Sequence, residues 1–201
     1  MAPSPIPALP IPVLPIPVQP IPVLAFLLLA LAGPAPAGAQ GTTPLPHPSD
    51  VASPDSIVAA VYDVISGPAG QPRDWDRFRS LFLPEARLVS VGQNREGQLT
   101  YRAMTPDEYA EMAAPGFQQN GFFEEEMGRV QEEFGPVVHR FSAYQAKRAP
   151  TDDEPFARGI NSFQLLYDGD RWWVLTIYWT AERPDLPIPE RYLSGGGRPY
   201  P

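Results

Sequence analysis

The 201-residue sequence contains no cysteine, which excludes disulfide bonds, thiolate nucleophiles and thiolate metal sites. Histidine is almost as scarce. With only His47 and His139 present, we expect no multi-histidine metal centre, and we expect no metal or organic cofactor. The basic residues are dispersed, and the formal net charge is -8. Because a nucleic acid or an anionic membrane surface calls for a cationic face, neither is expected as a partner.

Charged side chains are also missing from the first forty residues. These residues open with a Pro-rich repeat and continue into a proline-free apolar run at 23–33, followed by Ala37-Gly38-Ala39. The run has the length of a signal peptide but is too short to span roughly 30 Å of hydrocarbon as a helix. We therefore expect residues 1–39 to be a leader and signal peptide cleaved near Ala39. The mature protein would be periplasmic or secreted without a stable membrane span, and an uncleaved membrane anchor is the alternative.

Composition divides the remainder into three parts. Residues 40–53 are rich in proline, serine and threonine, which predicts a flexible linker. Residues 184–201 are rich in proline and glycine, which predicts an extended tail. The chain between them, 54–183, has the length and hydrophobic content of a single domain.

Helical spacing and capping residues predict three helices. The first begins after Ser53 and stops before Gly67, and the second runs from Asp74 to Pro84. A third helix opens at Thr105 with a proline at its first position and Glu108 three residues on, and it ends at Pro115.

Alternating apolar residues predict six strands. Two short ones lie between 86 and 103 around a turn, and four long ones lie at about 122–134, 137–148, 156–167 and 171–181. Gly128 predicts a bulge. The fold is therefore expected to be α+β, with three N-terminal helices packed on one strongly curved, mostly antiparallel sheet of about six strands, as a cone-shaped barrel.

This order of motifs resembles the nuclear transport factor 2-like superfamily, which includes SnoaL-like polyketide cyclases and ketosteroid isomerases. The resemblance rests on SIVAAVYDVI, DWDRFRSLFLPEARLV, the TPDEY helix and the closing DGDRWWVLTIYW, and it covers about residues 54–182. It implies a cavity between the helices and the sheet. The superfamily includes isomerases, cyclases, dehydratases and non-catalytic binders, so the resemblance implies a fold rather than an activity.

Likeness to the ketosteroid isomerases implies an oxyanion-hole position for Tyr62. The position of their general-base aspartate is occupied by about Ser90, and that of their protonated acid falls near Asn161 or Ser162. Because two of the three working groups lack a carboxyl, that mechanism is not carried over. Asn161 and Ser162 point to opposite faces of a strand, so at most one of them can enter the cavity.

We expect the protein to bind a small, largely apolar molecule in this cavity. The candidate ligand-binding residues are Trp75, Phe78, Tyr109, Phe141, Asn161 and Trp179. The alternative is a cofactor-independent isomerase, cyclase or lyase that uses His139 as base and Tyr62 as oxyanion donor, because imidazole titrates near neutral pH. A further alternative is an envelope interaction module whose pocket is filled by its own side chains.

Two other patterns bear on partners. Consecutive acidic residues at Glu124-Glu125-Glu126 lack the spacing of a calcium loop, so we expect a solvated acidic edge. Both faces of the strand at 171–181 are apolar, and one of them must face away from the helices. The simplest cover for that outer face is a second copy of the chain, so we expect a homodimer.

Overall fold

The structure is a computed structural model that describes residues 44–193. The expected leader and signal peptide, the first residues of the expected linker and the end of the tail lie outside this range. Within the described part, no helix is both long enough and apolar enough to cross a membrane.

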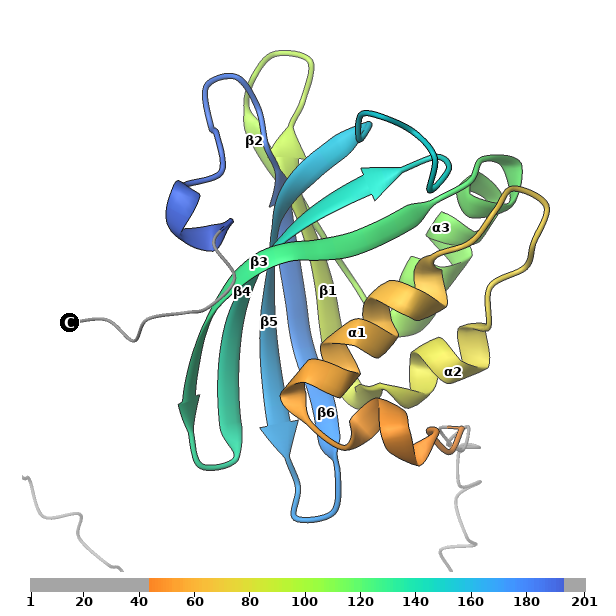
Figure 1. The fold of residues 1–201 in the computed structure, drawn as a ribbon, viewed down its shortest axis with the longest axis vertical. Helices are drawn as coiled ribbons and strands as arrows, with labels where there is room; N and C mark the ends of the chain where they lie inside the picture. The colour runs from red at the N-terminus through yellow and green to blue at the C-terminus, as the bar shows by residue number, and fades with distance from the viewer. Residues whose placement is uncertain (1–43, 194–201) are drawn as a thin grey trace, which may run out of the picture. The chain divides into compact units, whose positions relative to one another are not determined.

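Three helices lie on one side of a curved six-stranded sheet (Figure 1). In chain order the elements are η1 (Pro48–Val51), α1 (Pro54–Ile65), α2 (Trp75–Ser80), β1 (Phe82–Gln93), β2 (Leu99–Met104), α3 (Pro106–Gln119), β3 (Phe123–Phe134), β4 (Val137–Lys147), β5 (Ala157–Tyr167), β6 (Trp172–Ala181) and η2 (Glu190–Tyr192). The strand order is β2-β1-β6-β5-β4-β3, and β1 and β6 are the parallel pair in an otherwise antiparallel sheet. The predicted α+β class is confirmed. The sheet is not a closed barrel, because β2 and β3 are edge strands at its two ends.

Local capping fixes the starts of the helices as predicted. The Ser53 side chain accepts a hydrogen bond from the Ser56 backbone N–H at 3.0 Å, and α1 follows. At α3, Thr105 and Glu108 form a reciprocal capping box, with bonds of 3.2 and 2.7 Å. Each bond satisfies a backbone donor that the first turn of a helix leaves free.

Two predicted helix ends are wrong. The second helix stops at Ser80 rather than Pro84, because Phe82 already pairs with Val174 of β6 and continues as β1. Tertiary pairing thus overrides the helical pattern. The third helix continues through Pro115 to Gln119, where the Asn120 backbone N–H closes the last turn on the Gly116 carbonyl at 2.9 Å.

Bulges in the sheet decide which side chains face the helices. The predicted bulge near Gly128 is confirmed by a register shift between Glu126 and Gly128. A second shift, which the sequence did not predict, lies where β5 and β6 pair. As a result Trp172 and Trp179 both face the helix side, although simple alternation along β6 puts them on opposite faces.

Parts of the expected linker and tail are folded onto the domain. In η1, Asp50 is buried and accepts a hydrogen bond from Arg77 Nε at 2.8 Å. After β6, Ile188 is buried, and the ring of Tyr192 stacks on Phe141 with centroids 5.6 Å apart. The segment after β6 therefore covers part of the outer face of the sheet.

Candidate functional site

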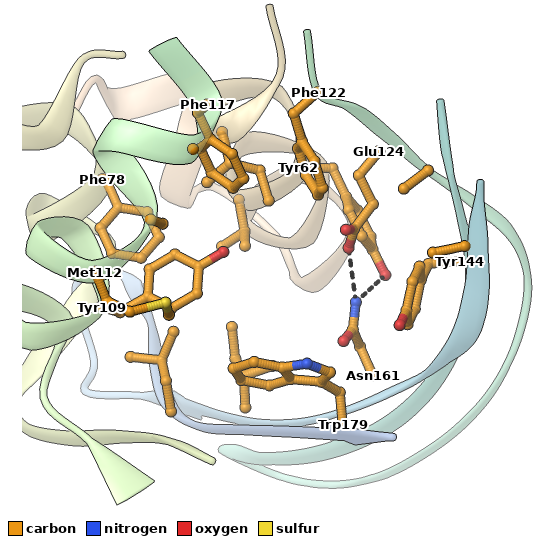
Figure 2. Close-up of a pocket in the computed structure, with 18 of the residues that line it drawn as sticks. Tyr62, Phe78, Tyr109, Met112, Phe117, Phe122, Glu124, Tyr144, Asn161 and Trp179 are labelled. Carbon is orange, nitrogen blue, oxygen red and sulfur yellow. Dashed lines mark hydrogen bonds between the residues drawn. The ribbon is translucent and has the colours of Figure 1, made fainter. Parts of the chain in front are cut away.

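A cavity of about 450 Å³ lies between α1, α3 and the inner face of the sheet (Figure 2). Aromatic and aliphatic side chains make up most of its wall: Val61, Ile65, Phe78, Leu88, Tyr109, Met112, Phe117, Phe122, Tyr144, Phe163, Ile177 and Trp179. Its few polar groups include Glu124, Asn161 and Tyr62, which hydrogen bonds join into one cluster. The cavity is therefore an apolar chamber with one polar end.

Five of the residues predicted from the sequence lie in the wall of this cavity: Tyr62, Phe78, Tyr109, Asn161 and Trp179. Trp75 lies behind the wall, where its ring packs edge-on to Phe78 with centroids 5.5 Å apart and stacks on Phe117 at 6.3 Å. Trp75 therefore supports the rings that face the cavity rather than facing it. Whether the five wall residues bind a ligand stays a prediction.

The expected placement of His139 and Phe141 in the cavity is wrong. Both side chains point from β4 to the outer face, where His139 Nε2 lies 3.0 Å from Ser162 Oγ and the two rings lie 5.2 Å apart. Alternation along β4 turns Arg140, Ser142 and Tyr144 inward instead, and all three are buried. A general-base role for His139 in this cavity is not compatible with this placement.

Glu124 of β3 is the residue that the sequence did not single out. It lies at the polar end of the cavity, and its carboxyl Oε1 accepts a hydrogen bond from Asn161 Nδ2 at 3.0 Å (Figure 2). Its backbone N–H donates to Ser66 Oγ at 3.0 Å, which ties β3 to the end of α1. The expected solvated acidic edge is wrong for Glu124, because α1 covers the inner face of this edge strand. Its neighbour Glu125 is exposed, as expected.

The environment of Glu124 favours the uncharged carboxyl. Burial raises the pKa of Glu124 to about 7, an effect that the Asn161 hydrogen bond only partly offsets. Among the ion pairs of the described residues, none involves Glu124. At neutral pH the cavity therefore contains a carboxyl that titrates and has no basic partner.

The charge of this carboxyl acts on three tyrosine hydroxyls of the cavity wall. Burial, with the charge of Glu124 as a second cause, raises the pKa of Tyr62, Tyr109 and Tyr144 well above its usual range. All three phenols therefore stay protonated at physiological pH.

A second inward-facing carboxyl, Glu126, lies two residues along β3 and is fully paired. Its oxygens accept hydrogen bonds from Ser142 Oγ at 2.5 Å and from Arg129 Nη1 at 2.7 Å, and Arg140 Nη1 is 3.7 Å away. The buried Arg140 also bonds Asp55 on α1. The charge of Glu126 is thus balanced by two arginines.

Pairing at Glu126 determines where the hydrogen of the Tyr62 hydroxyl points. Because Ser142 donates its single hydrogen to Glu126, Tyr62 donates to Ser142 Oγ, 2.7 Å away. The Tyr62 oxygen then accepts from Asn161 Nδ2 at 3.1 Å. In this arrangement Tyr62 has no hydrogen left for a ligand, so the expected oxyanion-donor role has no support in the geometry.

Metal binding has no evident site in the part of the chain that is described. Across residues 44–193, no group of three or more histidine, aspartate or glutamate side chains is arranged to hold a metal ion.

Comparison with known proteins gives a likeness of fold. No protein-family model and no curated protein matches the chain. Similar solved structures include an NTF2-like protein of unknown function from Silicibacter pomeroyi, 14% identical over 65% of this chain and 94% of that chain, with a TM-score of 0.44. An NTF2-like protein of unknown function from Methylobacillus flagellatus is 12% identical over 65% and 95%, with a TM-score of 0.41. A protein of unknown function with a cystatin-like fold from Nostoc punctiforme is 10% identical over 66% and 90%, with a TM-score of 0.48.

NTF2-like proteins, which the sequence resemblance names, are among these neighbours. At 9–14% identity, the likeness says nothing about activity, ligand or partner.

Proposed function

We propose that this protein binds a small, largely apolar molecule in the cavity between the helices and the sheet. The observation that carries the proposal is the apolar chamber itself, whose volume of about 450 Å³ lies in the range of roughly 300–1,000 Å³ that is usual for small-molecule sites. A chamber of this size speaks against an interaction module with a filled interior. The single polar end would orient the ligand.

Titration with Nile red, a neutral apolar dye, tests this proposal. We expect saturable binding with one dye per chain and an emission shifted to the blue, as in an apolar site. The variant Ala113→Phe places a ring in the cavity and should weaken binding at least about tenfold, because the ring occupies space that the dye needs. Ala59→Phe, at an exposed position on α1, is the matched control.

Native mass spectrometry of the purified protein would complement the titration, because a ligand that co-purifies would identify itself by mass. Dye binding that is equal in Ala113→Phe, Ala59→Phe and the parent protein would contradict the proposal.

Proton transfer on a bound molecule is a second candidate, favoured by one observation. Glu124 faces the cavity, and its pKa of about 7 suits a general acid or base at neutral pH. Such an enzyme would use Glu124 instead of His139 and would need no cofactor. A probe with an acidic C–H bond would then exchange hydrogen for deuterium in the presence of the protein but not of Glu124→Gln.

Export and dimerisation complete the proposal. The apolar run at 23–33 and Ala37-Gly38-Ala39 support a cleaved signal peptide, which mass spectrometry of the mature N-terminus tests.

For the dimer, Tyr101 and Tyr178 are exposed on the outer face of the sheet. Sedimentation at micromolar concentration should give a dimer that Tyr178→Glu dissociates. A strictly monomeric parent protein would overturn this part.

A further inference from the structure

The polar end of the cavity has an acceptor, the Glu124 carboxyl, that forms no ion pair with any residue in the described range 44–193. The Glu124 carboxyl has one side-chain hydrogen bond, from the uncharged amide of Asn161, whereas Glu126 on the same strand has two arginines. A carboxylate held away from water without a counter-ion costs free energy unless a partner supplies positive charge.

Aromatic rings surround the same end of the cavity. Glu124, Tyr144, Asn161 and Trp179 face one another there, with Phe122 close by (Figure 2). The faces of such rings carry partial negative charge and attract cations within about 6 Å. A carboxylate among aromatic rings is suited to an ammonium group more than to a neutral or anionic one.

The net charge of the chain also favours a cationic ligand. At -8 it attracts cations from solution and repels anions. Among the described residues of the cavity wall, Arg148 is the basic one; it is exposed, and its guanidinium lies 3.7 Å from the ring centroid of Phe156. That arginine lies at the rim and leaves Glu124 without an ion pair.

We propose that the molecule held in this cavity is an apolar amine, whose protonated nitrogen pairs with the carboxylate of Glu124 while its hydrocarbon part fills the chamber. The inference rests on the proposed function and deepens it by naming the ligand class. Ionised Glu124 accepts from the ammonium group, and the Asn161 amide holds the carboxyl in place.

This pairing makes binding depend on pH with a defined sign. Burial raises the pKa of Glu124 to about 7, so the carboxyl is ionised above that value, and an alkylamine stays protonated up to about pH 10. Amine affinity should therefore rise from pH 5 to pH 8, by up to about 100-fold if only the ionised carboxyl binds.

Other titratable groups near Glu124 are accounted for. The hydroxyls on which its charge acts are those of Tyr62, Tyr109 and Tyr144, which stay protonated over this range. The remaining charged groups in the cavity wall and in the adjoining groove are Asp55, Asp63, Glu125, Glu126, Arg129, Arg140, Lys147 and Arg148. The variant Glu124→Gln separates their contribution, since any pH dependence that persists in it belongs to them.

The experiment compares three probes with one skeleton by isothermal titration calorimetry: 4-phenylbutylamine, 4-phenylbutan-1-ol and 4-phenylbutanoate. At pH 8 we expect the amine to bind at least about tenfold more tightly than the alcohol, because hydrogen bonds to charged groups are the stronger ones. In Glu124→Gln this preference should fall below about threefold, together with the pH dependence. Glu125→Gln, an exposed carboxyl on the other face of β3, is the matched control and should keep both.

The outcomes separate the two proposals. If the alcohol binds as tightly as the amine, or if Glu124→Gln leaves the preference unchanged, the proposal of an amine ligand is contradicted. The proposal that the cavity binds an apolar molecule is then retained. Tighter binding of the carboxylate probe also overturns it and points to Arg148. If neither these probes nor Nile red binds, both the proposed function and the proposal of an amine ligand are contradicted. Circular dichroism of Glu124→Gln confirms that the variant is folded.

Discussion

Glu124 and Glu126 belong to one strand and face the same side of the sheet, yet their surroundings differ. Glu126 meets two arginines and a serine. Its hydrogen bond from Ser142 joins β3 to β4, and its ion pair with Arg140, which also bonds Asp55, links the sheet to α1. The Glu124 carboxyl accepts a hydrogen bond from one amide and faces a cavity, and its charge acts on three phenols. A buried charge that is fully paired serves the fold, and one left unpaired beside a cavity is available to a ligand.

The largest loss of stability should come from removing an ion-pair partner of Glu126. Arg140→Met removes a buried guanidinium and leaves Glu126 with Arg129 alone, so we expect the free energy of unfolding to fall by about 3–5 kcal/mol. Urea unfolding measures the loss. The double variant Arg140→Met with Glu126→Gln should recover part of it, and a loss below about 1 kcal/mol in the single variant would remove the distinction between the two carboxyls.

The contribution of the unpaired Glu124 to the free energy of unfolding should depend on pH. Because folding raises the pKa of Glu124 from 4.5 to about 7, the folded state holds this proton more tightly than the unfolded state. Stability should therefore fall as pH rises from about 4.5 to 7, by at most about 3 kcal/mol.

Glu124→Gln should remove this dependence and be the more stable protein at pH 8. Urea unfolding of both proteins at pH 5 and pH 8 makes the comparison. A parent protein that gains stability relative to Glu124→Gln as pH rises would reverse the predicted sign.

The Tyr62 hydroxyl lies between Ser142, a partner of Glu126, and Asn161, the partner of Glu124. It should contribute less to stability. Tyr62→Phe removes the bonds to Ser142 and Asn161 while keeping the ring against Phe163, so we expect a loss of about 1–2 kcal/mol. The same variant should keep Nile red affinity within about threefold, since the hydrogen of Tyr62 points to Ser142. Thermal unfolding and dye titration of one sample check both statements.

A substitution on the outer face of the sheet should change the free energy of unfolding least. His139→Gln replaces a half-buried ring whose nitrogen bonds Ser162, and we expect a cost below about 1 kcal/mol and unchanged Nile red binding. A loss of dye binding in this variant would put His139 back in contact with the cavity.

Sequence patterns predicted the fold well because its signals are local. The caps at Ser53 and Thr105 and the hairpin at 168–170 each depend on residues within a few positions of one another. One error arose at Phe82, where distant pairing with β6 prevails over local preference. The other lies beyond Pro115, where the local bond from the Asn120 N–H to the Gly116 carbonyl extends α3.

The site was less predictable, because alternation along a strand states which residues share a face but not which face is inside. His139 and Phe141 of β4 were expected in the cavity, whereas Arg140 and Ser142 of the same strand face inward and are buried. Glu124 was misplaced for a related reason. β3 is indeed an edge strand, and no local signal in an acidic triplet reveals that α1 covers one of its faces.

Carbon-detected NMR of the glutamate carboxyls through a pH titration tests the central claim most directly. We predict one carboxyl resonance with a midpoint near pH 7 that is absent from Glu124→Gln and present in Glu125→Gln. A titration in which every carboxyl has its midpoint below about pH 5, or in which the resonance near pH 7 persists in Glu124→Gln, would contradict the account.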